Sequence, residues 1–435
     1  MVAAGIALLA TWGAGIGAAV IAMRHEPKAS ALDTKLDGVQ QPSKAAQPTK
    51  PPVTAPPAAA AVEGPCWPTY GRTSGRTSDA AAIDHGIPKT MTWQLRIGIM
   101  EFPPSFCDGV LYVNNQRGVT WAIDAARKRV IWRRQSARMF DSTPAISGSR
   151  VFIGSYEPGD IQALDRRTGR LLWRLRTGAG VESSPVVSGG LVYATSRDRR
   201  VYAIDEATGK VRWAFRTGGE VKDSPTVVNG LVYVANYVGE VFALNARTGR
   251  VQWHRSVGGV LGDRIYSSVP VVGGRAYFGT IRGHIHAVDA RTGRDIWQQS
   301  IPGYLYATPA ISGGTLFVGN YPGRVYAFRT RDGGELWSRS IGGSMSGSPT
   351  VIGGLVYVSS LSARHTYALS AKTGRVAWQL PQGRYVSGIA TDRAIYLSLN
   401  DVLSRWTSAE GEARHGKPGT RSRVGSRAPA RTAFG

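Results

Sequence analysis

Between residues 91 and 406, apolar and polar residues alternate in short runs such as LVYATS (191–196) and VYAID (201–205). A period of two places successive side chains on opposite faces of a strand, whereas a helix needs a period of 3.6. Tight Gly-Gly or Asn-Gly turns separate many of the runs, and such turns are a strong hairpin signal. The pattern therefore predicts an antiparallel, all-β domain.

One sequence unit recurs in this region about every forty residues and carries a tryptophan in its last predicted strand. In one copy the four predicted strands are SSPVVSG (183–189), LVYATS, VYAID and VRWAFR (211–216). Four antiparallel strands per repeat are typical of a propeller blade. Because tryptophan recurs at one position, we predict that it packs between neighbouring blades. The tryptophans are Trp93, Trp132, Trp173, Trp213, Trp253, Trp297, Trp337 and Trp378.

The ends of the repeat region are complementary. Seven complete copies run from about 103 to 380, residues 384–406 supply three strands without a fourth, and residues 91–97 supply a fourth strand without its three. Joining the two ends closes the ring and removes exposed sheet edges. We therefore predict an eight-bladed β-propeller of four-stranded antiparallel blades, closed by the N-terminal strand. Seven blades with unpaired ends is the alternative.

Three segments of different composition flank the predicted propeller, which we place at 66–406. Residues 2–23 carry no charge and are long enough to cross a hydrocarbon layer of about 30 Å. We expect 1–25 to be a transmembrane signal-anchor, with a signal peptide cleaved after Ala22 as the alternative. We expect 26–65, rich in Pro and Ala, to be a disordered linker and 407–435 a basic disordered tail. The propeller would then lie outside the cytoplasm, membrane-anchored or, after cleavage, secreted.

The chain is strongly basic, with a net charge of +24, and arginine supplies 43 of its 53 basic residues. A basic surface attracts polyanions, so a polyanion-binding or nucleic-acid-binding protein is one alternative function. The arginines, however, recur at equivalent repeat positions such as Arg170, Arg250 and Arg294 instead of forming one cluster. This distribution argues against a nucleic-acid partner. The two cysteines, Cys66 and Cys107, are either a disulfide in an oxidising compartment or two unpaired thiols.

The recurring unit A-x-D-x-x-T-G-x-x-x-W resembles the tryptophan-docking motif of the pyrroloquinoline quinone (PQQ) propeller superfamily. The resemblance covers about residues 91–406, and CWPTYGRTSGRTS (66–78) looks like the lead-in of that group. The superfamily includes dehydrogenases and non-catalytic members, among them an outer-membrane-assembly lipoprotein subunit and sensor domains. The resemblance implies that an enzyme would hold PQQ over the central channel, with Ca²⁺ bound by a Glu and an Asn, an Asp base and often adjacent cysteines.

This sequence has no adjacent cysteines and no long insertion between blades that would cap a cofactor. We therefore favour a non-catalytic member without cofactor and keep a PQQ-dependent dehydrogenase as the alternative. We also expect no metal site. His284 and His286 share one face of a predicted strand, but no further ligand has a comparable position, and His286 replaces the tyrosine of the VYA motif.

The residues before each innermost strand are expected to gather around the mouth of the central channel, and the loops between second and third strands open on the same face. Tyrosine beside acidic groups can recognise a protein, peptide or glycan. We therefore predict a binding or scaffold propeller, monomeric, with its partner at the channel mouth; a solvated ring of loops without a partner is the alternative. The predicted mouth residues are Glu101, Asp141, Glu182, Lys222, Asp223, Tyr266, Tyr306 and Tyr385 before the strands, and Tyr156, Tyr237 and Tyr321 in the loops.

Overall fold

The computed structural model describes residues 66–83, 86–140, 142–257, 262–385 and 388–408. Every regular element in these residues is a β-strand, and they include no helix suited to spanning a bilayer. The expected anchor (1–25) and linker (26–65) lie outside the described residues, as does the expected basic tail after Ser408.

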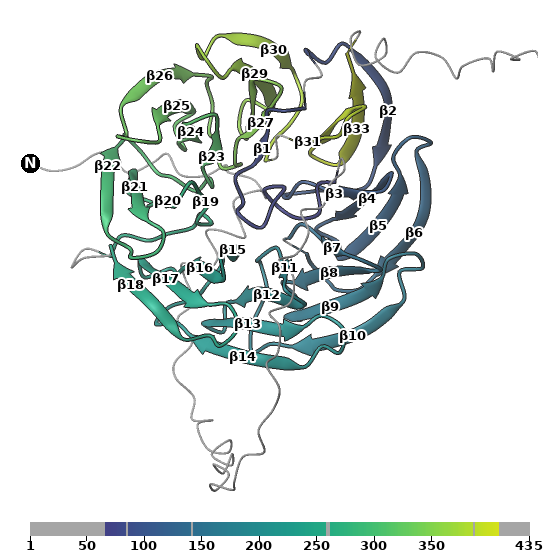
Figure 1. Ribbon diagram of the computed structural model, residues 1–435. Helices are drawn as coiled ribbons and strands as arrows, with labels where there is room; N and C mark the ends of the chain where they lie inside the picture. Colours follow the sequence, from purple (N-terminus) through teal and green to yellow (C-terminus); the bar gives the residue numbers. More distant parts are fainter. Residues whose placement is uncertain (1–65, 84–85, 141, 258–261, 386–387, 409–435) are drawn as a thin grey trace, which may run out of the picture. The chain divides into compact units, whose positions relative to one another are not determined.

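The strands form a ring of eight four-stranded antiparallel blades, which confirms the predicted fold (Figure 1). Blade 1 consists of β3 (Ser105–Cys107), β4 (Val110–Asn114), β5 (Val119–Asp124) and β6 (Arg129–Gln135). Blade 2 consists of β7 (Ala145–Ser147), β8 (Arg150–Ser155), β9 (Asp160–Asp165) and β10 (Leu171–Arg176). Blade 3 consists of β11 (Val186–Ser188), β12 (Leu191–Ser196), β13 (Arg200–Asp205) and β14 (Val211–Arg216). Blade 4 consists of β15 (Thr226–Val228), β16 (Leu231–Ala235), β17 (Glu240–Asn245) and β18 (Val251–Ser256). Blade 5 consists of β19 (Val271–Val272), β20 (Arg275–Gly279), β21 (His284–Asp289) and β22 (Asp295–Ser300). Blade 6 consists of β23 (Ala310–Ser312), β24 (Thr315–Gly319), β25 (Arg324–Arg329) and β26 (Glu335–Ser340). Blade 7 is β27 (Thr350–Ile352), β28 (Leu355–Ser360), β29 (His365–Ser370), β30 (Val376–Leu380), with the short β1 (Asp79–Ala80) parallel to β27.

Blade 8 joins the two ends of the propeller, as the sequence predicted. Its inner strands are β31 (Ile389–Ala390), β32 (Ile395–Leu399) and β33 (Val402–Thr407), and its outer strand is β2 (Thr90–Arg96). β2 pairs antiparallel with β33, with Trp93 opposite Arg405. The pairing covers an edge that β33 would otherwise expose to other chains.

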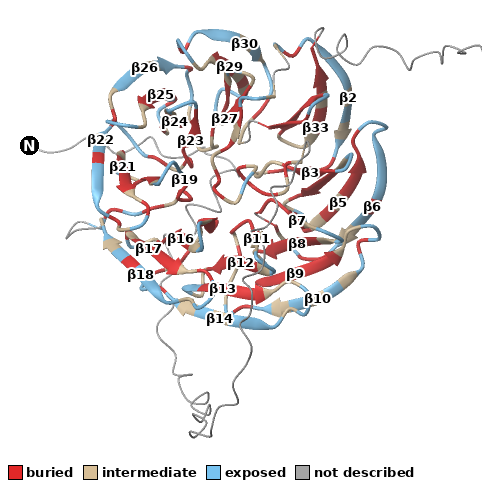
Figure 2. Cartoon of the chain, in the orientation of Figure 1, coloured by how far each residue is buried: buried red, intermediate tan, exposed pale blue. Residues whose placement is uncertain are grey.

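Burial follows the position of a strand within its blade (Figure 2). The second and third strands are almost wholly buried, because neighbouring blades cover both of their faces. The fourth strand alternates between exposed and partly buried residues, as β14 shows. A β-bulge precedes the tryptophan in every fourth strand, for example between Val211 and Trp213, and turns the side chain toward the next blade.

Seven of the eight repeat tryptophans dock on the following blade in the same way. The indole Nε1 donates a hydrogen bond to a carbonyl in the turn before the next fourth strand, as from Trp253 to Ala290 O at 2.8 Å. In six of the seven, all but Trp93, the ring also lies against the turn glycine; a Cβ on Gly293 would be 2.8 Å from Trp253 Cδ2. The other donors in this pattern are Trp93, Trp132, Trp173, Trp213, Trp297 and Trp337. Trp378 instead packs on Trp406 of blade 8, with ring centroids 5.7 Å apart.

Residues 67–80, which we call the plug, wind around the centre of the ring along the innermost strands (Figure 1). Six innermost-strand amides donate hydrogen bonds of 2.8–3.0 Å to plug carbonyls, and Thr69 Oγ1 donates to Pro185 O of blade 3. The plug thus contacts blades 1 to 7 in succession. The bonded pairs are Phe106–Trp67, Ile146–Pro68, Val227–Ser74, Val271–Gly75, Ile311–Thr77 and Val351–Ser78. A disulfide between Cys66 and Cys107 ties the start of the plug to β3.

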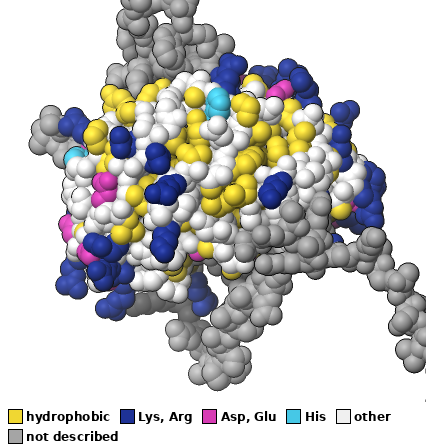
Figure 3. Space-filling view, turned by 90° about the horizontal axis from the view of Figure 1, so that it is seen from above, with side chains coloured by type: hydrophobic (Ala, Val, Ile, Leu, Met, Phe, Trp, Pro, Cys, Tyr) yellow, Lys and Arg dark blue, Asp and Glu magenta, His cyan; other side chains and the backbone are white. Residues whose placement is uncertain are grey.

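Basic side chains are spread over the edge of the propeller in Figure 3, with apolar side chains between them and few acidic ones. The apolar positions include Leu336 and Val376, each 44 % exposed on a fourth strand. On the face shown, the basic side chains are spread out and are not gathered into one cluster.

Candidate binding face at the channel mouth

The mouth of the central channel is built from equivalent positions immediately before the innermost strands. In blades 3, 4 and 6 this position is Glu182, Lys222 and Tyr306. Blade 5 has one extra residue before its proline. Ser267 hydrogen-bonds Gly279 of the second strand, as Ser183 hydrogen-bonds Thr195 in blade 3, so Ser267 is the equivalent of Ser183. Tyr266 therefore takes the equivalent position in blade 5.

Four tyrosines form a continuous arc across blades 4 to 6. The ring centroids of Tyr237 and Tyr266 are 4.2 Å apart, those of Tyr266 and Tyr306 5.3 Å, and those of Tyr306 and Tyr321 5.6 Å. Tyr304 extends the arc beside Tyr306 and is 54 % exposed. Aromatic rings with a polar tip are suited to contact a partner over both apolar and hydrogen-bonding groups. We call these residues the tyrosine arc.

One end of the tyrosine arc meets charged residues of blades 3 and 4. Lys222 Nζ lies 4.4 Å from the ring centroid of Tyr237 and 3.8 Å from Glu182 Oε1. Arg197 Nε is 3.6 Å from Glu182 Oε1 and 2.9 Å from Glu220 Oε2. Burial raises the pKa of Glu182, while Lys222 and Arg197 act in the opposite direction. The same burial, with the hydrogen bond to Tyr266, raises the pKa of Tyr237 well above its usual range.

The other end approaches Glu101 and Tyr385. Burial, followed by the nearby Glu182 carboxylate, raises the pKa of Glu101, although Arg384 and a hydrogen bond from Gln116 oppose the shift. Burial and the charge of Glu101 raise the pKa of Tyr385. Glu101 therefore lies within electrostatic range of Glu182 and of Tyr385.

The loops between second and third strands contribute unequally. Tyr156 accepts a 2.6 Å hydrogen bond from Arg197 Nη1 at the mouth. Asn115 and Asn320 instead close their own turns, each accepting a backbone amide through Oδ1 and donating from Nδ2 to a carbonyl. Asp141 lies outside the described residues.

A belt of hydroxyl groups and the plug close the channel below the mouth. From blade 2 to blade 7, the backbone amide of one Ser or Thr donates to the hydroxyl of its equivalent in the next blade, at 2.9–3.1 Å. Arg76 of the plug is 0 % exposed and donates to the carbonyls of Tyr70, Ser184 and Pro225. Sequence reasoning missed both features. The recurring Ser-Pro and Thr-Pro pairs were the available signal for the belt.

Asp223 must be removed from the predicted mouth. Only 4 % of it is exposed, and its Oδ2 accepts the Ala235 amide as the equivalent serines do in other blades. Its Oδ1 is buried and has no hydrogen-bond partner among the described residues. Burial raises the pKa of Asp223 to about 8, against smaller opposing effects of the Ala235 amide and Arg76. The side chain therefore lies beneath the binding face, out of reach of a partner.

Replacing Asp223 by asparagine should flatten the pH dependence of stability between about pH 4 and pH 8. Between the unfolded pKa of about 4 and the folded pKa of about 8, the folded state binds more protons, so the contribution of Asp223 to stability falls as pH rises. Asparagine cannot ionise and keeps an oxygen for the Ala235 amide. Melting temperatures across this range should show D223N gaining most at pH 8.

The control is Asp205→Asn, because hydrogen bonds from Arg212 and Thr208 lower the pKa of Asp205 to about 2. Its contribution is lost only in acid, so D205N should leave the slope between pH 5 and 8 unchanged. A D223N profile parallel to the wild type would contradict the burial argument.

The donor set at the mouth fits PQQ with Ca²⁺ poorly. Glu182 is engaged by Lys222 and Arg197, and Asn115 uses both polar atoms, since it accepts the Val119 amide and donates to the Ile97 carbonyl after β2. A calcium ion needs six to eight oxygen ligands, and two cations beside Glu182 oppose a third. The cluster of metal-ligand types found in the described residues is Cys66, Cys107 and Asp108, whose sulfurs form the disulfide. His286 stacks on Phe278, and burial lowers its pKa to about 4.

The fold and its docking tryptophans define a PQQ-like propeller, as the tryptophan motif implied. The chain belongs to the family described as outer membrane protein assembly factor BamB, whose model matches residues 157–380. No curated protein sequence matches the chain.

Solved structures show the same fold at low identity. BamB from Moraxella catarrhalis is 20 % identical, with a TM-score of 0.63 over 74 % of this chain and 98 % of that one. A quinohemoprotein alcohol dehydrogenase from Comamonas testosteroni is 15 % identical (TM-score 0.67, 80 % of this chain and 81 % of that one). A europium-containing methanol dehydrogenase is 14 % identical (TM-score 0.65, 78 % and 91 %). The likeness therefore includes both assembly factors and dehydrogenases and does not separate them.

Proposed function

We propose that this protein is a non-catalytic binding or scaffold propeller that holds a protein or peptide segment at the channel mouth. The observation that carries the proposal is the continuous tyrosine arc, which ends on charged residues at Lys222 and Glu182. Tyrosine offers a large rigid contact area at low entropic cost, and acidic and basic groups add orientation. The description of the family as an outer membrane protein assembly factor supports a protein as the partner.

The closed channel supports the same function. The belt and plug give the mouth a rigid floor, so a partner rests on a preformed surface instead of entering a tunnel. A preformed surface loses little conformational entropy on binding. We further propose that residues 1–25 tether the propeller to a membrane, outside the cytoplasm. Fractionation of the full chain and of a chain lacking 1–25 tests the tether; equal solubility of the two would refute it.

The mouth is tested with the double variant Tyr266→Ser and Tyr306→Ser in the tagged full chain. Captured polypeptides from membrane extract should fall at least tenfold relative to wild type, since hot-spot aromatic residues contribute most of an interface's binding energy. The matched control is Leu336→Ser with Val376→Ser, which removes exposed apolar side chains from the outer edge. The control should capture the same polypeptides as wild type. Undiminished capture by the mouth variant, at an unchanged melting temperature, would refute the assignment.

A further inference from the structure

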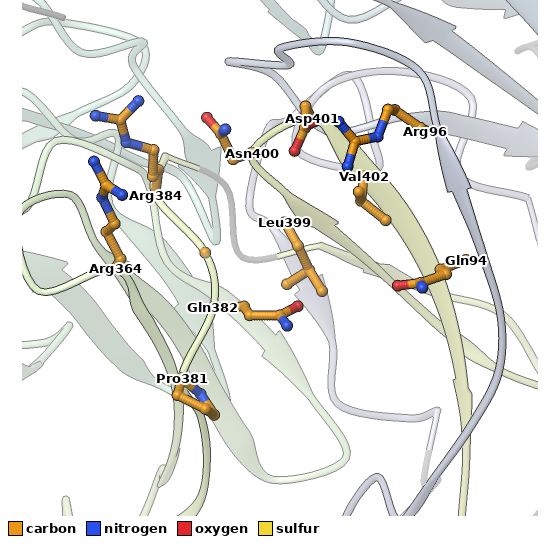
Figure 4. Close-up of a pocket in the computed structure, with 11 residues that line it drawn as sticks. Gln94, Arg96, Arg364, Pro381, Gln382, Arg384, Leu399, Asn400, Asp401 and Val402 are labelled. Carbon is orange, nitrogen blue, oxygen red and sulfur yellow. Dashed lines mark ion pairs between the residues drawn. The ribbon is translucent and has the colours of Figure 1, made fainter.

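A pocket of about 420 Å³ lies between blades 7 and 8, outside the tyrosine arc (Figure 4). One wall consists of residues 381–384 after β30, together with Arg364 from the turn between β28 and β29. The other consists of the end of β2 and the β32–β33 turn, 399–402. The pocket is therefore built where the two ends of the propeller meet, and its volume is within the range of small-molecule sites.

The charges of the pocket are unbalanced. Arg96 pairs with Asp401 at 3.2 Å on one wall. On the opposite wall, Arg364 and Arg384 both line the pocket (Figure 4). Within the described ranges, no ion pair engages either of these two arginines. Two cations on one wall that no ion pair among the described residues engages favour the binding of an anion.

Arg384 is positioned by the ring of Tyr385. Its guanidinium carbon lies 5.8 Å from the ring centroid of Tyr385, and its Nε is buried without a hydrogen-bond partner in the part of the chain described. Arg384 acts to lower the pKa of Glu101, but no ion pair among the described residues joins the two, and Glu101 Oε1 accepts a hydrogen bond from Gln116. A buried donor without a partner is costly, and a ligand oxygen would satisfy it.

The rest of the lining combines apolar and amide groups. Pro381, Leu399 and Val402 supply apolar surface, and Gln382 and Asn400 supply amides. A ligand that fits this lining carries a single strong anionic group on a small organic body. Arginine suits such a group because its planar fork can donate two parallel hydrogen bonds to one oxyanion.

We propose that this pocket binds a small ligand bearing an oxyanion, a carboxylate or a phosphate, which Arg364 and Arg384 hold. The site is separate from the tyrosine arc, and the proposal does not depend on the proposed function. A bound ligand would connect blade 7 to both strands that close blade 8. It should therefore stabilise the closed ring in proportion to the logarithm of its concentration above Kd.

The test is calorimetric titration of the full chain with sodium phosphate and with glutarate, at constant ionic strength made up with chloride. Saturable binding of one anion with one site per chain is expected, and the anion that binds identifies the source of the oxyanion. The double variant Arg364→Gln with Arg384→Gln should weaken binding at least tenfold. Arg384→Lys, which keeps the charge and loses the fork, should weaken it by several-fold.

The matched control is Arg247→Gln with Arg291→Gln, which removes the same charge from exposed turns of blades 4 and 5. It should bind the anion as wild type does. Absence of saturable binding of both anions to the wild type would overturn the proposal, as would an equal loss in the control. Melting temperatures without anion identify any variant that fails to fold, and Arg384→Lys then serves in place of the double variant. Loss of partner capture at the tyrosine arc would leave this result unchanged.

Discussion

Replacing Arg76 by methionine should lower the free energy of unfolding by about 3–5 kcal/mol, the cost of removing one partner from a buried charged network. Arg76 donates hydrogen bonds of 2.6–2.9 Å to three buried carbonyls, on the plug and on blades 3 and 4. Methionine keeps an apolar stem of similar length, so the loss reports on the hydrogen bonds. Burial lowers the pKa of Arg76 only to about 10, so it remains a charged donor at neutral pH.

The measurement is chemical denaturation combined with hydrogen exchange. The amides of Val227 and Val271 bond the plug carbonyls of Ser74 and Gly75 and should exchange faster in R76M. The control is Arg72→Met in the same segment, because Arg72 is only partly buried and donates to one carbonyl, Asp79 O, at 2.7 Å. Equal losses in R76M and R72M would show that Arg76 does not secure the plug.

Replacing Trp253 by alanine should cost about 3–5 kcal/mol of stability, as expected for a large buried side chain. Trp253 is 8 % exposed, donates to Ala290 O at 2.8 Å and packs beside Tyr233, with ring centroids 6.1 Å apart. The truncation leaves a cavity between blades 4 and 5 and an unpaired carbonyl. Trp253→Phe keeps most of the packing and should lose less stability. The expected loss is about 1 kcal/mol for the hydrogen bond plus part of the packing contribution of the indole ring.

The control for Trp253 is Val251→Ala on the same strand, β18. Val251 is 46 % exposed, so its truncation should change stability by less than about 1 kcal/mol. Denaturation midpoints of the three variants should therefore follow the order V251A, W253F, W253A, from the highest to the lowest. A W253A midpoint equal to that of V251A would refute the docking role of the repeat tryptophan.

Sequence reasoning located the mouth better than it described the individual residues. It placed Glu101, Glu182 and the tyrosines at one opening because the repeat aligns equivalent loops, and the structure brings these residues together. It misplaced Asp223 because a mouth position and a buried position are adjacent in the sequence. In an irregular segment, the alternation of apolar and polar residues does not tell which of the two side chains is buried. It also treated Trp378 like the other tryptophans, although blade 8 has no turn between β33 and β2 to receive it.

The sequence by itself determined the blade: its four strands, its turns, its docking tryptophan and the closure at eight. These features depend on local alternation and on a period that the chain repeats, so they are readable without coordinates. Only the tertiary structure decided how the centre of the ring is filled. The plug has no periodic pattern, and its hydrogen bonds join residues up to 278 positions apart, as from Tyr70 to Ser348. The arginine pocket is likewise formed by contacts between the two ends of the ring, which no local pattern records.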